Sequence, residues 1–301
     1  MVAILRPAAV WLPERLAFAV ARVAGQLYAS LPVHDPNELK VIGKSFGTES
    51  GPVLTRAIRC RHFIDFVAVR RGLAGKRTLP IRQENRELLD DLERQPSSYI
   101  IATGHFARQP MMALYSADVV TDPVVAVVNP AVPKSRHPGQ IWRRALFGQM
   151  LQYLERLRPD VQTVLPGNKA FKNAIAALRS SRRALIIAVD APWSRERPGS
   201  LIRDFAGREG MAFSTGTARL ARMLQCPIIV CVPIVSPQGE AILKWGPIIR
   251  APDTDDQIFD VGVTNKLLDI IEKEIALRPD QYVIEFMGPR HWNEQENKWE
   301  K

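Results

Sequence analysis

SYIIATGH at residues 98–105 and RRALIIAVDAP at residues 182–192 are the two stretches that decide the fold. Each is a short, continuous apolar run, which is typical of a strand buried on both faces of a sheet. Three further runs have the same character, and helical patterns separate all five; these runs are residues 122–130, 161–166 and 227–235. The alternation predicts an α/β fold with a central, mainly parallel or mixed sheet that helices cover on both faces.

A helical N-terminal layer is predicted ahead of this sheet. Apolar residues recur at helical spacing through much of residues 33–98, and no internal repeat or low-complexity linker is visible in the chain. We therefore predict an apolar amphipathic segment at residues 1–32 and a single α/β domain at residues 33–301.

The N-terminal segment is too interrupted to make a clean membrane span. Residues 8–32 contain Pro13 and Arg22, whereas a spanning helix needs about 20 mostly apolar residues. A helix beginning at Pro13 would place Arg15, Arg22 and Gln26 on one narrow stripe beside a wide apolar face. Two interpretations stay open: a helix packed on the core, or a helix lying in the membrane interface with its arginines at headgroup level.

Composition narrows the classes of partner. The chain has 301 residues, 46 % of them hydrophobic, and a formal net charge of +10, which suits a globular protein that meets polyanions. No RRM, KH or zinc-finger spacing is present, so nucleic acid is not an expected partner. The three cysteines form no CxxC pair, which argues against a disulfide framework and against a zinc site, and we expect no metal.

The candidate catalytic residues follow two of the predicted strands. His105 comes directly after one strand and Asp190 directly after another, and ligands of open α/β sheets gather at the carboxyl ends of strands. If the two side chains face each other, the carboxylate would fix the imidazole tautomer while the other ring nitrogen takes a proton from an alcohol. The alternative is a structural one, in which both are hydrogen-bonded turn residues.

Four blocks together resemble the lipid A biosynthesis (late) acyltransferases of the lysophospholipid acyltransferase superfamily. The resemblance lies in their order and spacing along most of the chain, after an apolar N-terminal segment. The blocks are IIATGHFARQP (100–110), IIAVDAPWSRERPGSLIRDFAG (186–207), FSTGTARLARMLQCPIIVCVPIV (213–235) and IEKEIALRPDQYV (271–283).

The chain departs from the hallmark of that family, a histidine followed five residues later by Asp or Glu. Here Pro110 stands at that position, and proline cannot orient an imidazole. Two explanations stay open: Asp190 has taken over as the carboxylate partner, or catalysis is lost and a lipid-binding fold remains. We favour the first, because His105 and Asp190 both stand at matching places. If they do not meet, the search for a carboxylate turns to Asp118, Asp204 or Glu209.

The resemblance implies acyl transfer from a thioester, acyl-CoA or acyl carrier protein, to a hydroxyl of a lipid or glycolipid. His105 would act as general base, and Arg108, Arg195 and Arg197 would contact a phosphate or the acceptor. No cofactor beyond the acyl donor is implied. The protein is expected at an anionic membrane surface, peripheral on the cytoplasmic face of the inner membrane, or in the cytoplasm. Transfer to a soluble hydroxyl or amine acceptor is a further alternative.

Overall fold

The computed structural model places the sheet, helices on both of its faces and two N-terminal helices. It describes residues 2–30, 63–64, 66–67, 70–71, 74–75, 81–106, 119–127, 158–164, 170–191, 193, 195–235, 241–250, 257–282, 291–293 and 298–300. The predicted site residue Arg108, together with Pro110 and Asp118, lies outside these ranges.

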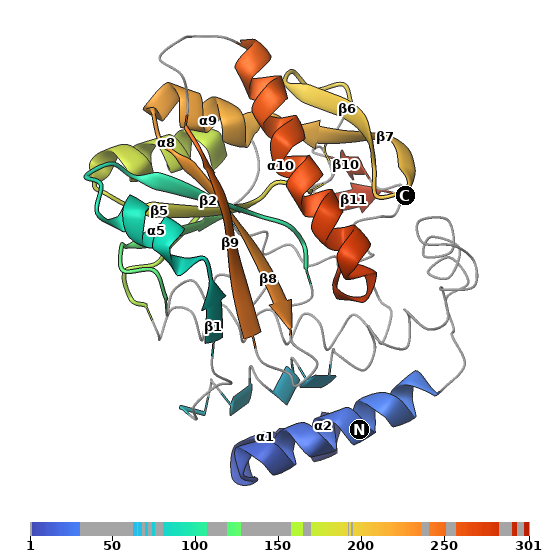
Figure 1. The fold of residues 1–301 in the computed structure, drawn as a ribbon. Helices are drawn as coiled ribbons and strands as arrows, with labels where there is room; N and C mark the ends of the chain where they lie inside the picture. The colour runs from blue at the N-terminus through green and yellow to red at the C-terminus, as the bar shows by residue number, and fades with distance from the viewer. Residues whose placement is uncertain are drawn as a thin grey trace.

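A seven-stranded mixed sheet forms the centre of the molecule (Figure 1). Five strands run parallel and two run opposite to them, because β9 pairs antiparallel with β8 and β1 pairs parallel with β9. The order across the sheet is β1 (Ile81–Glu84), β9 (Ala241–Ile249), β8 (Ile228–Val235), β2 (Tyr99–Thr103), β5 (Ala184–Ala188), β3 (Val124–Val127) and β4 (Gln162–Val164).

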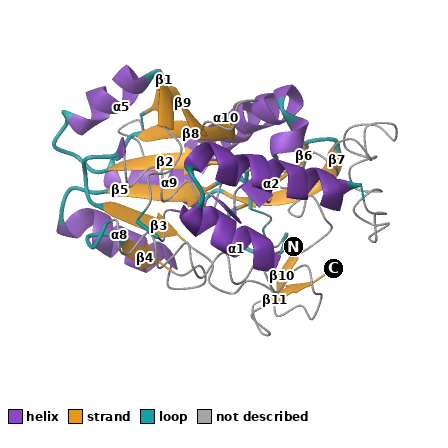
Figure 2. Cartoon of the chain, turned by 90° about the horizontal axis from the view of Figure 1, so that it is seen from below, coloured by secondary structure: helices purple, strands orange, loops and turns teal. Residues whose placement is uncertain are grey.

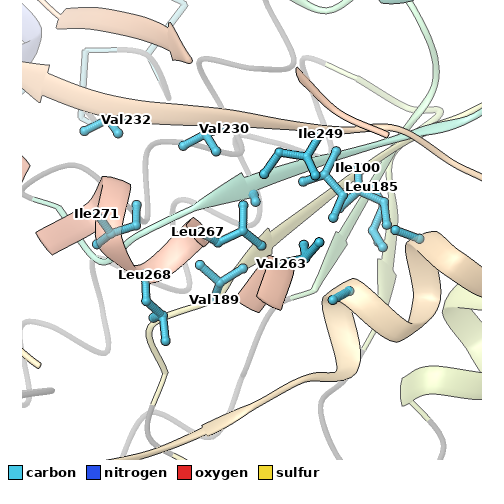
Figure 3. Close-up of a cluster of buried hydrophobic side chains, with 14 of the residues drawn as sticks. Ile100, Leu185, Val189, Val230, Val232, Ile249, Val263, Leu267, Leu268 and Ile271 are labelled. Carbon is cyan, nitrogen blue, oxygen red and sulfur yellow. The ribbon is translucent and has the colours of Figure 1, made fainter. Parts of the chain in front are cut away.

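Helices cover both faces of this sheet. Successive side chains of a strand point to opposite faces, so Ile100 and Ala102 of β2 belong to one apolar cluster while Tyr99 and Ile101 belong to another. Helix α5 (Arg86–Glu93) covers the second cluster through Leu89 and Leu92. The first cluster, part of which Figure 3 shows, is covered by α8 (Ala170–Ser180), α9 (Gly216–Leu224) and α10 (Gln257–Leu277).

A β-hairpin leaves the sheet between β5 and α9. Its strands are β6 (Ser200–Phe205) and β7 (Arg208–Ser214), and its turn residues Ala206 and Gly207 both have positive φ, 49° and 74°. Two positive φ values are the geometry of the tight turn whose twist suits a hairpin. Arg203 of β6 bonds two carboxylates of α10, Asp269 at 2.7 Å and Glu272 at 2.8 Å, so the hairpin is fastened to that helix.

The N-terminal segment forms two helices, α1 (Val2–Trp11) and α2 (Glu14–Ala29), which lie side by side in Figure 2. Small and aromatic residues of one face pack in a separate apolar cluster with Phe63, Phe66 and Val67. The opposite face is uncovered: Trp11, Leu16, Val23 and Leu27 are 81 %, 54 %, 56 % and 62 % exposed. Within the described residues, no helix combines the length and the apolar character that crossing a membrane requires.

The five strands that the sequence predicts are confirmed as β2, β3, β4, β5 and β8. The largely helical interpretation of residues 33–98 is wrong at residues 81–84, which form β1 along one edge of the sheet. Strand β9 and the β6–β7 hairpin were not predicted as strands. After α10, a short 3-10 helix, η2 (Pro279–Gln281), leads the chain back to the sheet, and two short strands, β10 (His291–Asn293) and β11 (Lys298–Glu300), pair with each other.

Candidate active site

The register of two neighbouring strands brings His105 and Asp190 together. Strands β2 and β5 are parallel and adjacent, and the last residues of both, Thr103 and Ala188, are paired. The backbone N–H of Val189 donates to the carbonyl of Thr103 at 2.9 Å, which carries the pairing one step past the strand ends. His105 and Asp190 each stand two residues beyond that pair, so they meet at the carboxyl end of the sheet as the sequence predicts.

Three donors converge on the Asp190 carboxylate. His105 Nδ1 lies 2.6 Å from Asp190 Oδ1, and the backbone N–H of His105 donates to Oδ2 at 2.7 Å. The hydroxyl of Tyr282, which follows η2, donates to the same Oδ2 at 2.7 Å. An ionised carboxylate only accepts hydrogen bonds, so the proton of the His105–Asp190 bond lies on Nδ1 and the lone pair of the neutral ring lies on Nε2.

The electrostatics of the site favour the ionised carboxylate. Asp190 is only 1 % exposed, and this burial pushes its pKa upward. The charge of a protonated His105 and the hydrogen bonds from His105 and Tyr282 outweigh burial and hold the pKa of Asp190 below its ordinary value. Burial, and then the charge of Asp190, raise the pKa of Tyr282 well above its ordinary value. Tyr282 is therefore a hydroxyl donor throughout the physiological range.

An aromatic wall supports the site. The Tyr282 ring meets Phe106 edge-on, with centroids 5.6 Å apart, and lies 6.5 Å from Phe205 of the hairpin. Gly104 is required between β2 and His105, because a Cβ there would lie 2.9 Å from Ile271 Cγ2 of α10. The loop after β2, the hairpin and α10 thus fix the backbone that carries the imidazole.

Comparison with known proteins identifies the family of a chain with this site. The model of the bacterial lipid A biosynthesis acyltransferase family matches residues 64–285, which is more than half of the 301 residues. The chain belongs to this family. Its matched region includes His105, Asp190 and Tyr282, and membership makes the protein an acyltransferase.

Two other comparisons accompany this result. No curated protein matches the acyltransferase. Among solved structures, the 1-acyl-sn-glycerophosphate (LPA) acyltransferase PlsC from Thermotoga maritima is similar, with 13 % identity and a TM-score of 0.42. That match covers 88 % of this chain and 99 % of the PlsC chain.

Two of the three predicted arginines of the acyltransferase, Arg195 and Arg197, lie in described parts of the chain and already contact the protein. Arg195 donates to the carbonyl of Gly210 in β7, and the Arg197 guanidinium lies 4.6 Å from the centre of the Trp193 ring. Burial lowers the pKa of Arg197 below its ordinary value. Both side chains therefore help to hold Trp193 and residues 195–199 against the hairpin.

The structure also decides between the candidate carboxylates that it describes. Asp204 is exposed and accepts a bond from the N–H of Gly210 at 2.8 Å within the hairpin, and Glu209 is exposed. Of the three candidate carboxylates in the described part of the chain, Asp190 contacts His105. Within the described residues, no group of three or more His, Cys, Asp or Glu is placed to hold a metal ion.

Sequence reasoning missed two residues of the site, Tyr282 and Arg208. Tyr282 belongs to the PDQY stretch that carried part of the family resemblance, but no spacing signal links it to Asp190, 92 residues away. Arg208 of β7 interacts electrostatically with Tyr282, and burial lowers the pKa of this arginine. The only available sign for Arg208 was the Phe-x-Gly turn before it, which fixes its place at the start of β7.

Proposed function

We propose that the protein transfers a fatty acyl group from a thioester, acyl-CoA or acyl carrier protein, to a hydroxyl of a lipid or glycolipid. The pairing of His105 Nδ1 with the Asp190 carboxylate at 2.6 Å, in a chain of an acyltransferase family, carries this proposal. It supplies what hydroxyl activation needs, a neutral imidazole whose Nε2 carries the lone pair, and a carboxylate behind the ring.

The proposed reaction has two steps. Nε2 of His105 accepts the acceptor's hydroxyl proton as its oxygen attacks the thioester carbonyl carbon, and the C–O bond forms. The carbonyl oxygen becomes negative and needs hydrogen-bond donors or a basic side chain close by. The carbon–sulfur bond then breaks, the carbonyl re-forms, and the leaving thiolate takes the proton from Nε2. Asp190 stabilises the imidazolium between the two steps and accepts no proton itself.

Basic residues close to His105 and Asp190 in the sequence suit the charge of the proposed substrates. Both proposed donors are acidic, one through its phosphates and the other through its protein surface, and a net charge of +10 favours their approach. We propose that Arg108, Arg195 and Arg197 contact the phosphate of the donor or acceptor. The contacts of Arg195 with Gly210 and of Arg197 with Trp193 would hold their loop in place for this role.

The N-terminal helices suit attachment to a membrane surface. Leu16, Val23 and Leu27 recur at spacings of seven and four, so they form one stripe along α2, and exposed Arg15 and Arg22 lie beside it. A helix of this kind lies in the interface with its apolar side chains among the acyl chains and its cations at the headgroups. We propose peripheral attachment to the cytoplasmic face of the inner membrane, where anionic headgroups would meet the arginines.

The test is acceptor-dependent release of free thiol by the purified full-length protein. Palmitoyl-CoA and palmitoyl acyl carrier protein serve as donors, with a detergent-solubilised lysophospholipid, a lipid A precursor or a soluble sugar as acceptor. His105→Ala should lower the rate by about 10²–10⁴, because that is what a general base contributes. His291→Ala, in strand β10, is the matched control and should keep the rate.

Each outcome separates the alternatives. Unchanged turnover in His105→Ala would exclude the general-base mechanism. Turnover with the sugar and none with the lipids would show a soluble acceptor. Binding of lipid by wild type without turnover of any donor would show an inactive lipid-binding protein.

A further inference from the structure

The Tyr282 hydroxyl is a buried group that the proposed reaction does not use. Tyr282 is 2 % exposed, and its hydroxyl donates to Asp190 Oδ2 at 2.7 Å. The same oxygen accepts the backbone N–H of His105 at 2.7 Å, while Oδ1 faces the imidazole. Asp190 Oδ2 therefore has one donor from the loop after β2 and a second from the far end of the chain.

We infer that Tyr282 is a positioning residue, whose hydroxyl fixes the Asp190 carboxylate in the orientation that keeps the His105 proton on Nδ1. This inference rests on the proposed function, since it assigns a role within the same site. Asp190 follows a different strand from His105, and only side-chain torsions decide which way its oxygens point. Two donors on Oδ2 hold that oxygen away from the ring, so Oδ1 is left to accept the Nδ1 proton.

The surroundings of Tyr282 fit this role. Its backbone forms a bridge with Phe106, the residue after His105, and its ring is held edge-on by Phe106 and by Phe205. These contacts belong to the ring and the backbone, so they persist when the hydroxyl is removed. Tyr282→Phe therefore isolates the effect of the hydroxyl bond from that of the packing.

The charged groups around the bond give the direction of the pH effect. His105 and Tyr282 face Asp190, and Arg208 of β7 acts on Tyr282 from the hairpin. The hydroxyl bond is one of the causes that lower the pKa of Asp190. Without it the carboxylate is less stabilised by hydrogen bonds and attracts the imidazolium of His105 more strongly. The acid limb of the pH–rate profile reports protonation of Nε2, so it moves to higher pH.

The experiment compares wild type, Tyr282→Phe and Tyr99→Phe in the full-length protein. Tyr99 is the matched control, because it is also a fully buried tyrosine but lies at the opposite end of β2 from His105. Tyr282→Phe should lower kcat by about tenfold while KM changes less than twofold, because a hydrogen bond to a charged group is lost and no substrate contact is removed. Its acid limb should move to higher pH, and that of Tyr99→Phe should not.

A spectroscopic readout keeps the inference separate from the proposed function. The hydrogen-bonded Nδ1 proton of His105 should give a far-downfield proton resonance, assigned by its absence in His105→Ala. In Tyr282→Phe this resonance should broaden, because the carboxylate is less firmly held. If wild type transfers no acyl group, the resonance still tests the inference. A Tyr282→Phe variant with wild-type kcat, acid limb and resonance would overturn it, and so would equal effects of Tyr99→Phe.

Discussion

Replacing Asp190 with asparagine separates the charge of the site from its shape. The amide has nearly the volume of the carboxylate, but one of its two oxygens becomes an NH₂ donor. In one orientation the amide oxygen accepts from the His105 backbone N–H and the Tyr282 hydroxyl, and the NH₂ donates to Nδ1. That orientation satisfies every group now bonded to Asp190, so it should be the one adopted.

This orientation forces the wrong tautomer on the imidazole. Nδ1 becomes the acceptor, the ring proton moves to Nε2, and no lone pair faces the acceptor hydroxyl. The same change in a serine-protease triad lowers kcat by about 10⁴, and we expect a loss of about 10³–10⁴ here. The free energy of unfolding at pH 7 should change by less than about 2 kcal/mol, because weaker hydrogen bonds are offset by the relief of a buried charge.

The measurements are thiol release, for the rate, and chemical denaturation as a function of pH, for the stability. Folding lowers the pKa of the Asp190 carboxyl, so its ionised form stabilises the fold at any pH above the pKa in the unfolded chain, 3.8 for Asp. That contribution is lost as the pH falls through the lower pKa of the folded state. Any stability advantage of wild type over Asp190→Asn should therefore shrink below about pH 4. Asp269→Asn, at an exposed carboxylate paired with Arg203, is the control and should keep full activity. An Asp190→Asn rate within threefold of wild type, with His105→Ala inactive, would refute the reasoning.

Two further predictions concern the backbone of the site and the membrane surface. Gly104→Ala should lower the free energy of unfolding by about 1–3 kcal/mol and lower the rate, since its Cβ would press on Ile271 Cγ2. Chemical denaturation of Gly104→Ala, Ile271→Ala and the double variant should show that Gly104→Ala costs less stability when Ile271 is already alanine. Strictly additive losses of stability would contradict the contact. The double variant Val23→Glu/Leu27→Glu should keep the fold but no longer sediment with phosphatidylglycerol vesicles. The control Ile258→Glu, at a residue 78 % exposed on α10, should still sediment. Equal binding by wild type and both variants would exclude the α2 stripe as the attachment surface. Substitution is preferable to deletion of α2, which would uncover Phe63, Phe66 and Val67.

The sequence was sufficient for the strands that are buried on both faces. Runs such as YIIAT and ALIIA are almost entirely apolar and carry no charged residue, so β2 and β5 could be placed without a structure. Edge strand β1, IRQE, is polar because part of it faces solvent. Strand β9 contains Lys244, Gly246 and Pro247, which interrupt its apolar pattern and make the sequence look like a loop.

The candidate site was predictable only in part, for a related reason. His105 and Asp190 could be placed at strand ends, but their pairing requires β2 and β5 to be neighbours in the sheet. Local composition does not predict the order of the strands. Tyr282 was beyond reach because its bond to Asp190 depends on the path of the chain after α10. Long-range geometry of this kind leaves no periodic trace in a sequence.

His105 and Asp190 lie equally far, two residues, beyond the paired strand ends Thr103 and Ala188. This level placement has a consequence for how such proteins are found in genomes. A search that requires a carboxylate five residues after the histidine rejects this chain at Pro110. Positions that lie level on adjacent parallel strands are close in space whatever the length of chain between them, here 85 residues. A search that scores acidic residues level with the histidine, just after the neighbouring strand, would retain this chain and any other chain that places its carboxylate there.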